Sequence, residues 1–410
     1  MCSYSKVKEA CMFMNLKDKL FHLVEDQEQE MIQIRRHLHQ HPELSFQESN
    51  TAEYIKNFYH NKDVSLTQPI SDAHAIVVEI KGDKPGKTIA LRADFDALPI
   101  SEETEVPFKS QNEGVMHACG HDAHTAYLLG VANALIEVKE DLSGTVKIIH
   151  QHAEELPPGG AQQILASGAL ADVDEIYGIH IVPAVEPDTI AYNKNNAFAG
   201  SSTFTLTIKG LGGHAASPHK THDALIAGTQ FVNAIQTIVS RRIDPLETGV
   251  VTIGAFDAPG TANVIQDTVT IKGTARYLND DLEQFIYQEI DKIAQSVALG
   301  FDITYDLDYQ FGYPVLYNHP TQTDNAANVL AQSKGDYFQH LIEIPQVTGS
   351  EDFAYYLQQI PGTFYFIGSK PYNVDTPYMN HHPKFEVNED CLLVAAKSLI
   401  DITLDRLQNA

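Results

Sequence analysis

Residues 88–96 read TIALRADFD, and they set the expectation for the fold. The stretch starts as a short run rich in apolar and β-branched side chains and ends in two carboxylates, Asp94 and Asp96. A strand buried on both faces of a parallel sheet has this continuous apolar character, whereas a half-exposed strand alternates apolar and polar residues. The stretch therefore predicts a buried strand with acidic side chains at its carboxyl end.

Two later stretches show the same order of apolar and then polar residues. Residues 145–155 (TVKIIHQHAEE) end in Glu154 and Glu155, and residues 175–180 (EIYGIH) end in His180. Helical patterns lie between the strands, and this alternation predicts an α/β domain with a mostly parallel sheet. Ligands bind beyond the carboxyl ends of the strands in such sheets, so these polar side chains should converge.

Residues 116–124 (MHACGHDAH) hold the densest group of metal-ligand side chains, and they lead into a helical pattern over residues 128–138. Taken singly, a histidine at a strand end is usually hydrogen-bonded, and a lone cysteine is usually a small buried hydrophobe. Imidazole, thiolate and carboxylate groups gathered at one sheet edge instead suit a borderline cation such as zinc, manganese, nickel or cobalt. Together they predict a metal site.

The pattern changes at about Ala197, which marks the start of a second domain. Apolar residues alternate with threonines over residues 203–208, as in a half-exposed strand. The order that follows is strand, helix, strand, strand, helix, strand, as in a ferredoxin-like α+β unit. Its first helix is predicted to bury one face: Leu225, Gly228, Val232, Ile235 and Val239. We therefore expect a discontinuous catalytic domain, residues 1–196 plus 312–410, with residues 197–311 inserted as a lid or dimerisation domain.

The composition excludes several classes of partner. The formal net charge is -26, so the chain should repel phosphate backbones and anionic lipid headgroups. Residues 1–20 contain no apolar run of signal-peptide length, and no segment approaches the roughly 18 apolar residues of a membrane span. The four cysteines (Cys2, Cys11, Cys119 and Cys391) are too few and too scattered for a disulfide framework. We expect a cytoplasmic protein that binds neither nucleic acid nor membranes.

Short motifs in a fixed order resemble those of a known enzyme family. They are RRHLH (35–39), PEL (42–44), LRAD (91–94), DALP (96–99), HACGHD (117–122), AEE (153–155), GIH (178–180), GGHAA (212–216), NVI (263–265), GTAR (273–276), GSEDFA (349–354) and HHPKF (381–385). Through them the chain resembles the aminoacylase/carboxypeptidase-type dinuclear metallopeptidases, in the branch of hippurate hydrolases and auxin-amino-acid conjugate hydrolases. The resemblance implies a metal-dependent amidohydrolase that cuts the amide bond of small N-acyl amino acids or short peptides.

The resemblance also implies roles for residues of the catalytic domain. It assigns two divalent metal ions per subunit to five ligands: Cys119, His121, Glu155, His180 and His381. We prefer His381 to His382 because the family histidine usually stands two positions before the proline. The resemblance implies Glu154 as general base. Two adjacent glutamates suit two tasks, because successive side chains leave an extended backbone in opposite directions. Of the three histidines at positions 37, 39 and 41, only His39 matches, and we expect it to be structural.

In the inserted domain, the resemblance implies His214 as an oxyanion donor and Asn263 and Arg276 as contacts for the substrate's carboxylate. His214 would reach the metal site through a hinge near Ala197 and Phe311, or be supplied by a second subunit. We therefore expect a homodimer or a higher homo-oligomer.

Two alternatives stay open from the sequence. The first is a thiol hydrolase in which Cys119 is the nucleophile and His121 or His117 is its base. The second is a catalytically idle relative that keeps the fold as a binding or assembly module. Sensitivity to chelators distinguishes the first alternative from a metal enzyme, and turnover distinguishes the second.

Overall fold

The computed structural model describes residues 14–70 and 74–408, which form two compact units. The first unit runs to Asn195 and resumes at Tyr317–Pro345 and from Tyr355, and the second is Asn196–Leu316 with Gln346–Ala354. Residues 312–316 and 346–354 thus group with the second unit, although the sequence pattern assigns all of 312–410 to the catalytic domain. Cys2 and Cys11 lie outside the described residues.

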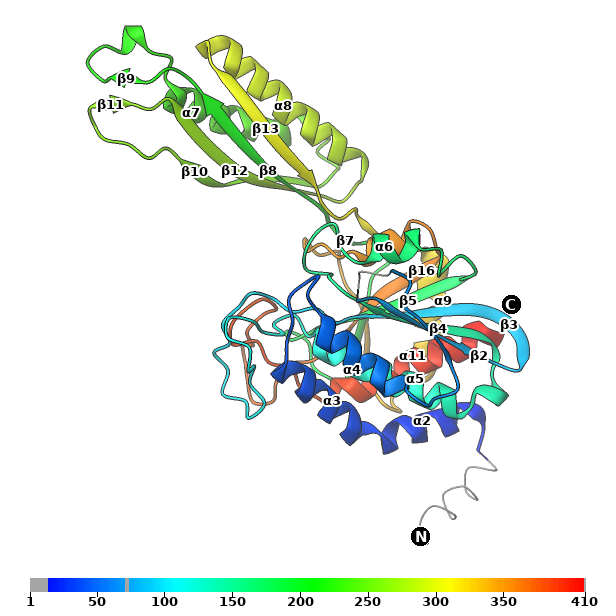
Figure 1. The fold of residues 1–410 in the computed structure, drawn as a ribbon. Helices are drawn as coiled ribbons and strands as arrows, with labels where there is room; N and C mark the ends of the chain where they lie inside the picture. The colour runs from blue at the N-terminus through cyan, green and yellow to red at the C-terminus, as the bar shows by residue number, and fades with distance from the viewer. Residues whose placement is uncertain (1–13, 71–73, 409–410) are drawn as a thin grey trace. The chain divides into compact units, whose positions relative to one another are not determined.

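The first unit is built on an eight-stranded sheet of order β1-β2-β4-β3-β5-β16-β6-β15. Figure 1 labels β2, β3, β4, β5 and β16 of this sheet. The strands are β1 Ser65–Thr67, β2 Ile76–Lys81, β3 Lys84–Asp94, β4 Ser143–Gln151, β5 Glu175–Val182, β6 Thr189–Tyr192, β15 His340–Glu343 and β16 Gly362–Gly368. The central strands β4, β3, β5 and β16 run parallel, whereas β2 and β6 pair antiparallel with β4 and β16. The predicted α/β class with a mostly parallel sheet is confirmed.

Helices α5 and α11 pack against this sheet, and the start of α5 determines where the site forms. Apart from the two helices that pack on the second unit's sheet, the α-helices are α2 Leu16–Asp26, α3 Glu28–Gln40, α4 Ser49–Tyr59, α5 His121–Glu137, α6 Ala161–Ala166, α9 Pro320–Gln332, α10 Phe353–Leu357 and α11 Cys391–Gln408. Gly120 precedes α5 with a φ of 95°, and a Cβ there would lie 2.3 Å from the Cδ1 of Ile181. A glycine is therefore required where α5 begins against the end of β5.

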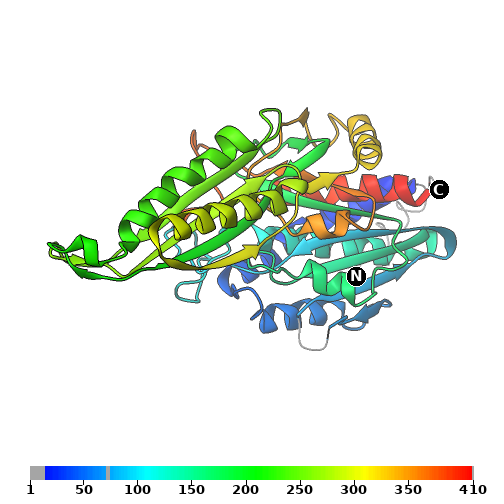
Figure 2. The same cartoon turned by 90° about the horizontal axis from the view of Figure 1, so that it is seen from above.

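The second unit is a four-stranded antiparallel sheet of order β10-β12-β8-β13 with α7 and α8 packed on one face (Figures 1 and 2). Its elements are β8 Gly200–Lys209, α7 Ala224–Thr237, β10 Gly249–Asp257, β12 Thr268–Tyr277, α8 Asp281–Phe301 and β13 Thr304–Phe311. This is the ferredoxin-like order expected from the sequence. A two-stranded ribbon, β9 (Gly213–His214) with β11 (Val264–Ile265), adjoins it, and two short strands lie at the unit boundary, β7 (Asn195–Phe198) and β14 (Leu316–Asn318).

The buried face of α7 matches the predicted one only in part. Gly228 and Ile235 are buried and Val232 packs against the core, as predicted. Leu225 and Val239 are instead 36% and 39% exposed, and Ala227 and Phe231 face the core. Apolar residues surround much of this helix, so their spacing fits more than one face and only contact with the sheet selects the buried one.

Candidate metal centre

The predicted ligands gather at the carboxyl ends of three neighbouring strands. β3 lies between β4 and β5, and the register pairs Asp94 with Gln151 of β4 and Arg92 with Gly178 of β5. Parallel strands end at the same edge of a sheet, so the segments that follow these residues come together. The apolar runs identified in the sequence thus bring their polar ends to one place.

Cys119, His121 and His180 each offer a donor atom, and these atoms lie within 4.8 Å of one another. The Sγ of Cys119 is 3.4 Å from the Nε2 of His180. The Nδ1 of His180 lies 2.8 Å from the carbonyl oxygen of Ile181, and the Nδ1 of His121 lies 3.0 Å from that of Asp96. A carbonyl only accepts, so each Nδ1 donates its proton and each Nε2 presents a lone pair, as metal-binding histidines require.

Glu155 and His381 form a second group with Cys119. The Nε2 of His381 lies 3.3 Å from the Oε1 of Glu155. His382 points elsewhere, because its ring stacks on Tyr378 with 4.3 Å between ring centroids. Cys119 belongs to both groups, so its sulfur would be available to a cation held by either set of ligands.

Glu154 lies beside its neighbour Glu155 at the ring of His121. The Oε2 of Glu154 and the Oε1 of Glu155 lie 4.0 and 3.9 Å from the Nε2 of His121. Both glutamates follow a turn at Ala153, whose φ is 51°, and lie in a bend beyond the end of β4. The expectation of an extended backbone at this pair was therefore wrong, and the turn sets the directions of the two side chains.

Buried Asp96 connects several parts of the centre. Its Oδ1 lies 3.2 Å from the Nδ1 of His121, and its Oδ2 accepts hydrogen bonds from the Ser45 hydroxyl (2.7 Å) and the Glu155 backbone N–H (2.9 Å). Burial alone would raise the pKa of Asp96, but its hydrogen bonds with the His121 ring, the Ser45 hydroxyl and the Glu155 N–H hold it below its ordinary value. A charged Asp96 can therefore orient His121 and Glu155 together.

His124 and His39 are buried and hold other parts of the centre. The Nδ1 of His124 lies 2.6 Å from Asp94, and its Nε2 accepts a hydrogen bond from the N–H of Ile181, which ties α5 to the end of β5. His39 lies 2.9 Å from Asp122, the neighbour of His121, which agrees with the structural role expected for it. His124 is not among the residues predicted for the site, although it belongs to the histidine-rich stretch 116–124.

The donor set fits a borderline divalent cation. The Nε2 of His121 is buried and has no hydrogen-bond partner among the described residues. Burying a polar atom without a hydrogen-bond partner costs free energy, and a bound cation would remove that cost. Burial and the nearby charge of Glu155 raise the pKa of the Cys119 thiol, so it is not an activated nucleophile of the low-pKa kind. A bound cation would displace the thiol proton and make the sulfur a ligand.

The candidate residues of the second unit lie at two separate places. His214 pairs with Val264 across the β9–β11 ribbon, and the Ala215 N–H donates to the carbonyl of Asn263, so His214 and Asn263 are neighbours. The Nδ1 of His214 accepts a hydrogen bond from the Ala216 N–H, which leaves its Nε2–H as a donor. Arg276 is on β12, where its Nη1 donates to Thr274.

The distance between these places follows from the register of β8 with β12. Thr268 pairs with Lys209 at the end next to the ribbon, whereas Arg276 pairs with Ser201 at the opposite end. Eight residues of strand span about 26 Å at about 3.3 Å per residue. The His214–Asn263 pair and Arg276 of one chain therefore cannot contact the same small molecule.

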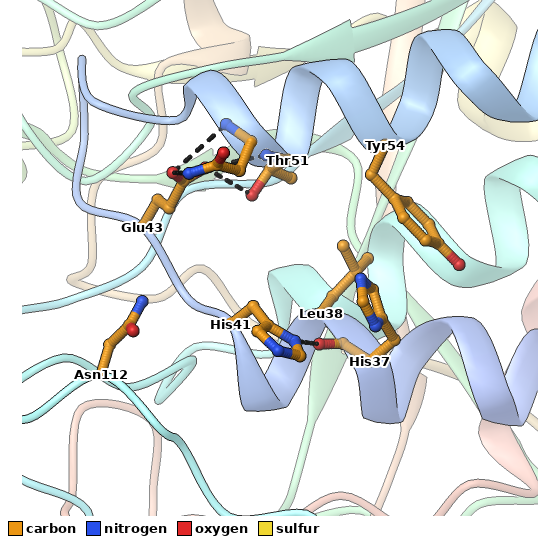
Figure 3. A pocket seen from close by; sticks show the side chains of 8 residues that line it. His37, Leu38, His41, Glu43, Thr51, Tyr54 and Asn112 are labelled. Carbon is orange, nitrogen blue, oxygen red and sulfur yellow. Dashed lines mark hydrogen bonds between the residues drawn. The ribbon is translucent and has the colours of Figure 1, made fainter.

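A pocket of about 300 Å³ lies between α3 and α4 (Figure 3). Its lining includes His37, His41 and Tyr54, and the ring of His37 stacks on that of Tyr54 with 4.5 Å between centroids. None of the predicted ligands lines this pocket, so the chemistry of the centre rests on its donor atoms and not on this cavity.

Comparisons with known proteins assign the family. Residues 90–405 match the family described as Peptidase family M20/M25/M40. The chain belongs to this family. N-acetyldiaminopimelate deacetylase of Streptococcus thermophilus is 39% identical over 378 residues (90% of this chain, 97% of the relative), and thermostable carboxypeptidase 1 of Saccharolobus solfataricus is 36% identical over 385 residues (93% and 97%). The solved structure of YXEP from Bacillus subtilis, a dinuclear metal binding peptidase from the M20 family, has a TM-score of 0.80 at 31% identity and covers 94% of this chain and 100% of its own.

As a member of the M20/M25/M40 family, the chain is a metal-dependent hydrolase that acts on C–N bonds of small amide or peptide substrates. The resemblance to dinuclear metallopeptidases is confirmed, and the hippurate hydrolase branch stays a prediction. Among the described residues, no helix is long and apolar enough to cross a bilayer.

Proposed function

We propose that the chain hydrolyses the amide bond of N-acyl amino acids, with Glu154 moving the proton and five residues holding two metal ions. These ligands are Cys119, His121, Glu155, His180 and His381. The observation that supports the proposal most strongly is the placement of Glu154 and Glu155 side by side at His121, since it offers both a ligand and a proton carrier. When bound, a pair of divalent cations lowers the pKa of water from about 15.7 to about 7 and polarises a carbonyl.

Glu154 carries a proton from the attacking water to the leaving nitrogen. It takes one proton from the attacking water as the new C–O bond forms, and it gives that proton to the nitrogen as the C–N bond breaks. The products are a carboxylic acid and a free amine. A positioned acid–base group of this kind contributes roughly 10²–10⁴-fold to the rate.

The substrate class follows from the relatives' chemistry. A deacetylase removes an acyl group from an amino acid, and a carboxypeptidase releases a C-terminal residue, which is itself an N-acylated amino acid with a free carboxylate. We propose that Arg276 and Asn263 bind this carboxylate, because a guanidinium group matches its two oxygens.

A screen of N-acetyl, N-benzoyl and dipeptide substrates with added manganese, zinc, cobalt or nickel tests the proposal. We expect turnover of at least one compound with a free α-carboxylate and none of its carboxamide, and an equal rate on both would contradict it.

Substitution of the adjacent glutamates should separate their roles. Glu154→Gln should keep the fold and most of the metal while lowering kcat by about a hundredfold or more, because an amide cannot accept the proton. Glu155→Gln should instead lose metal. Metal analysis and kcat of both purified variants are the measurements, with equal metal loss in the two variants as the result that would show the roles to be wrongly divided.

We propose further that the second unit acts as a lid and joins two chains into a homodimer in the cytoplasm. The exposed apolar residues Leu225, Ile226 and Val239 on and beside α7 support an association surface. The separation of His214 from Arg276 within one unit also favours a site that uses residues of two subunits.

A further inference from the structure

Glu48 is a fully buried carboxyl group outside the proposed ligand set. It directly precedes α4, and its side chain reaches the turn that carries the catalytic glutamates. Its Oε1 accepts hydrogen bonds from the N–H groups of Phe46 (2.9 Å) and Ala153 (2.8 Å). Both residues have positive φ, 65° for Phe46 and 51° for Ala153. One carboxyl oxygen thus fixes two residues in a backbone conformation that L-residues rarely adopt.

The left-handed conformation of Ala153 requires such support. It is strained for an L-residue other than glycine, and it persists only where neighbouring groups fix it. The carbonyl of Ala153 also accepts a hydrogen bond from Gly160 (3.1 Å), and the Glu155 N–H donates to Asp96 (2.9 Å). Glu48 therefore holds the start of the Ala153–Glu155 turn, and Asp96 holds its end.

We infer that Glu48 is a positioning residue that orients Glu154 and Glu155 through the N–H of Ala153. The turn at Ala153 sets the direction in which both glutamate side chains leave the backbone. Without the acceptor on Glu48, Ala153 can relax toward negative φ, and the two carboxylates move away from the ring of His121. This inference rests on the proposed roles of Glu154 and Glu155.

The surroundings of Glu48 indicate which substitution should preserve its function. Burial, with the nearby charge of Asp96, raises the pKa of Glu48 to about 8. The side chain is therefore mostly a neutral acid at pH 7, and its carbonyl oxygen is the acceptor that matters. A glutamine keeps that oxygen at the same reach, whereas an aspartate is one methylene too short to meet both N–H groups.

Glu43 offers a matched control. Its carboxylate accepts hydrogen bonds from the N–H groups of Asn50 (3.2 Å) and Thr51 (2.8 Å), so it too anchors the start of α4 (Figure 3). The hydrogen bonds of its side chain go to Asn50 and Thr51 and to no described residue of the 153–155 turn. Loss of Glu43 should reduce stability in the same region without moving the glutamates.

The test compares kcat, KM, Tm and cobalt binding in Glu48→Ala, Glu48→Asp, Glu48→Gln and Glu43→Ala. We expect Glu48→Ala and Glu48→Asp to lower kcat by roughly 10- to 100-fold, the range usual for residues that orient a metal centre, with little change in KM. Cobalt should bind more weakly, and the visible absorption of the cobalt-loaded protein should change. Glu48→Gln should stay within about threefold of the wild type, and Glu43→Ala should lower Tm while leaving kcat and the cobalt spectrum unchanged.

A second substitution tests the route through Ala153. Glycine adopts positive φ without strain, so adding Ala153→Gly to Glu48→Ala should restore part of the lost kcat. The inference is wrong if Glu48→Ala lowers kcat no more than Glu43→Ala, or, should Glu48→Ala not fold, if Glu48→Asp keeps full activity. Glu154→Gln and Glu155→Gln are measured in parallel: if both keep wild-type kcat the proposed function fails, whereas losses in them without a loss in the Glu48 variants overturn only this inference.

Discussion

Prolonged chelation should abolish hydrolysis, and an added divalent metal ion should restore it. The reason is the donor set, in which Cys119 joins His121 and His180 in one group and Glu155 and His381 in another. Imidazole, thiolate and carboxylate together favour zinc, cobalt, nickel or manganese. The measurement is kcat against metal content after dialysis with a chelator, with circular dichroism as the control for folding. Full activity in a verified metal-free sample would refute the metal mechanism.

Substitution of Cys119 tests the thiol-hydrolase alternative. Cys119→Ser should weaken metal binding by roughly tenfold or more, because a hydroxyl is a poorer ligand for these cations than a thiolate. Activity should return in part at high metal concentration. A cysteine nucleophile behaves differently, since its serine variant stays inactive at any metal concentration and the wild type forms a covalent acyl group on Cys119 that mass spectrometry detects during turnover.

The sequence predicted those parts of the site that depend on local pattern. The apolar runs ending in Asp94, in Glu154 and Glu155, and in His180 are strands β3, β4 and β5, and parallel pairing alone brings their ends together. The change to alternating residues near Ala197 marked the second unit for the same reason, because a half-exposed sheet has a different period from a buried one.

The supporting residues could not be predicted in this way, because their partners are distant in the sequence. Ser45 contacts Asp96, 51 positions away, and Glu48 contacts Ala153, 105 positions away. No periodicity encodes such contacts. The nearest signal was the PEL motif at residues 42–44, which ends just before Ser45 but carries no chemistry that would point to a metal centre. The ribbon of β9 and β11 was also missed, since two-residue strands leave no pattern.

The geometry of that ribbon bears on how the site is completed. His214 and Asn263 lie on the ribbon, beside the pair Thr268–Lys209, whereas Arg276 lies at the Ser201 end of the same sheet, about 26 Å away. A hinge moves the unit as a whole and leaves this separation unchanged. If His214 and Arg276 both contact one substrate, they must come from different chains, so we propose that His214 and Asn263 act in the partner's site.

His214→Ala should therefore lower kcat by roughly 10²–10³ with metal content unchanged, as the loss of an oxyanion donor does. This chain and the Glu154→Gln chain should each keep about a hundredth of the wild-type activity or less when assayed alone. In a heterodimer, the intact Glu154 of the first chain meets the intact His214 of the second, so one of the two sites is complete. Random mixing should then restore about a quarter of the wild-type activity per subunit, because about half of the dimers are mixed and each has one working site. Mixing two preparations of the same variant is the control. Wild-type kcat in His214→Ala would remove this residue from the mechanism, and no recovery in proven heterodimers would show that it acts within its own chain.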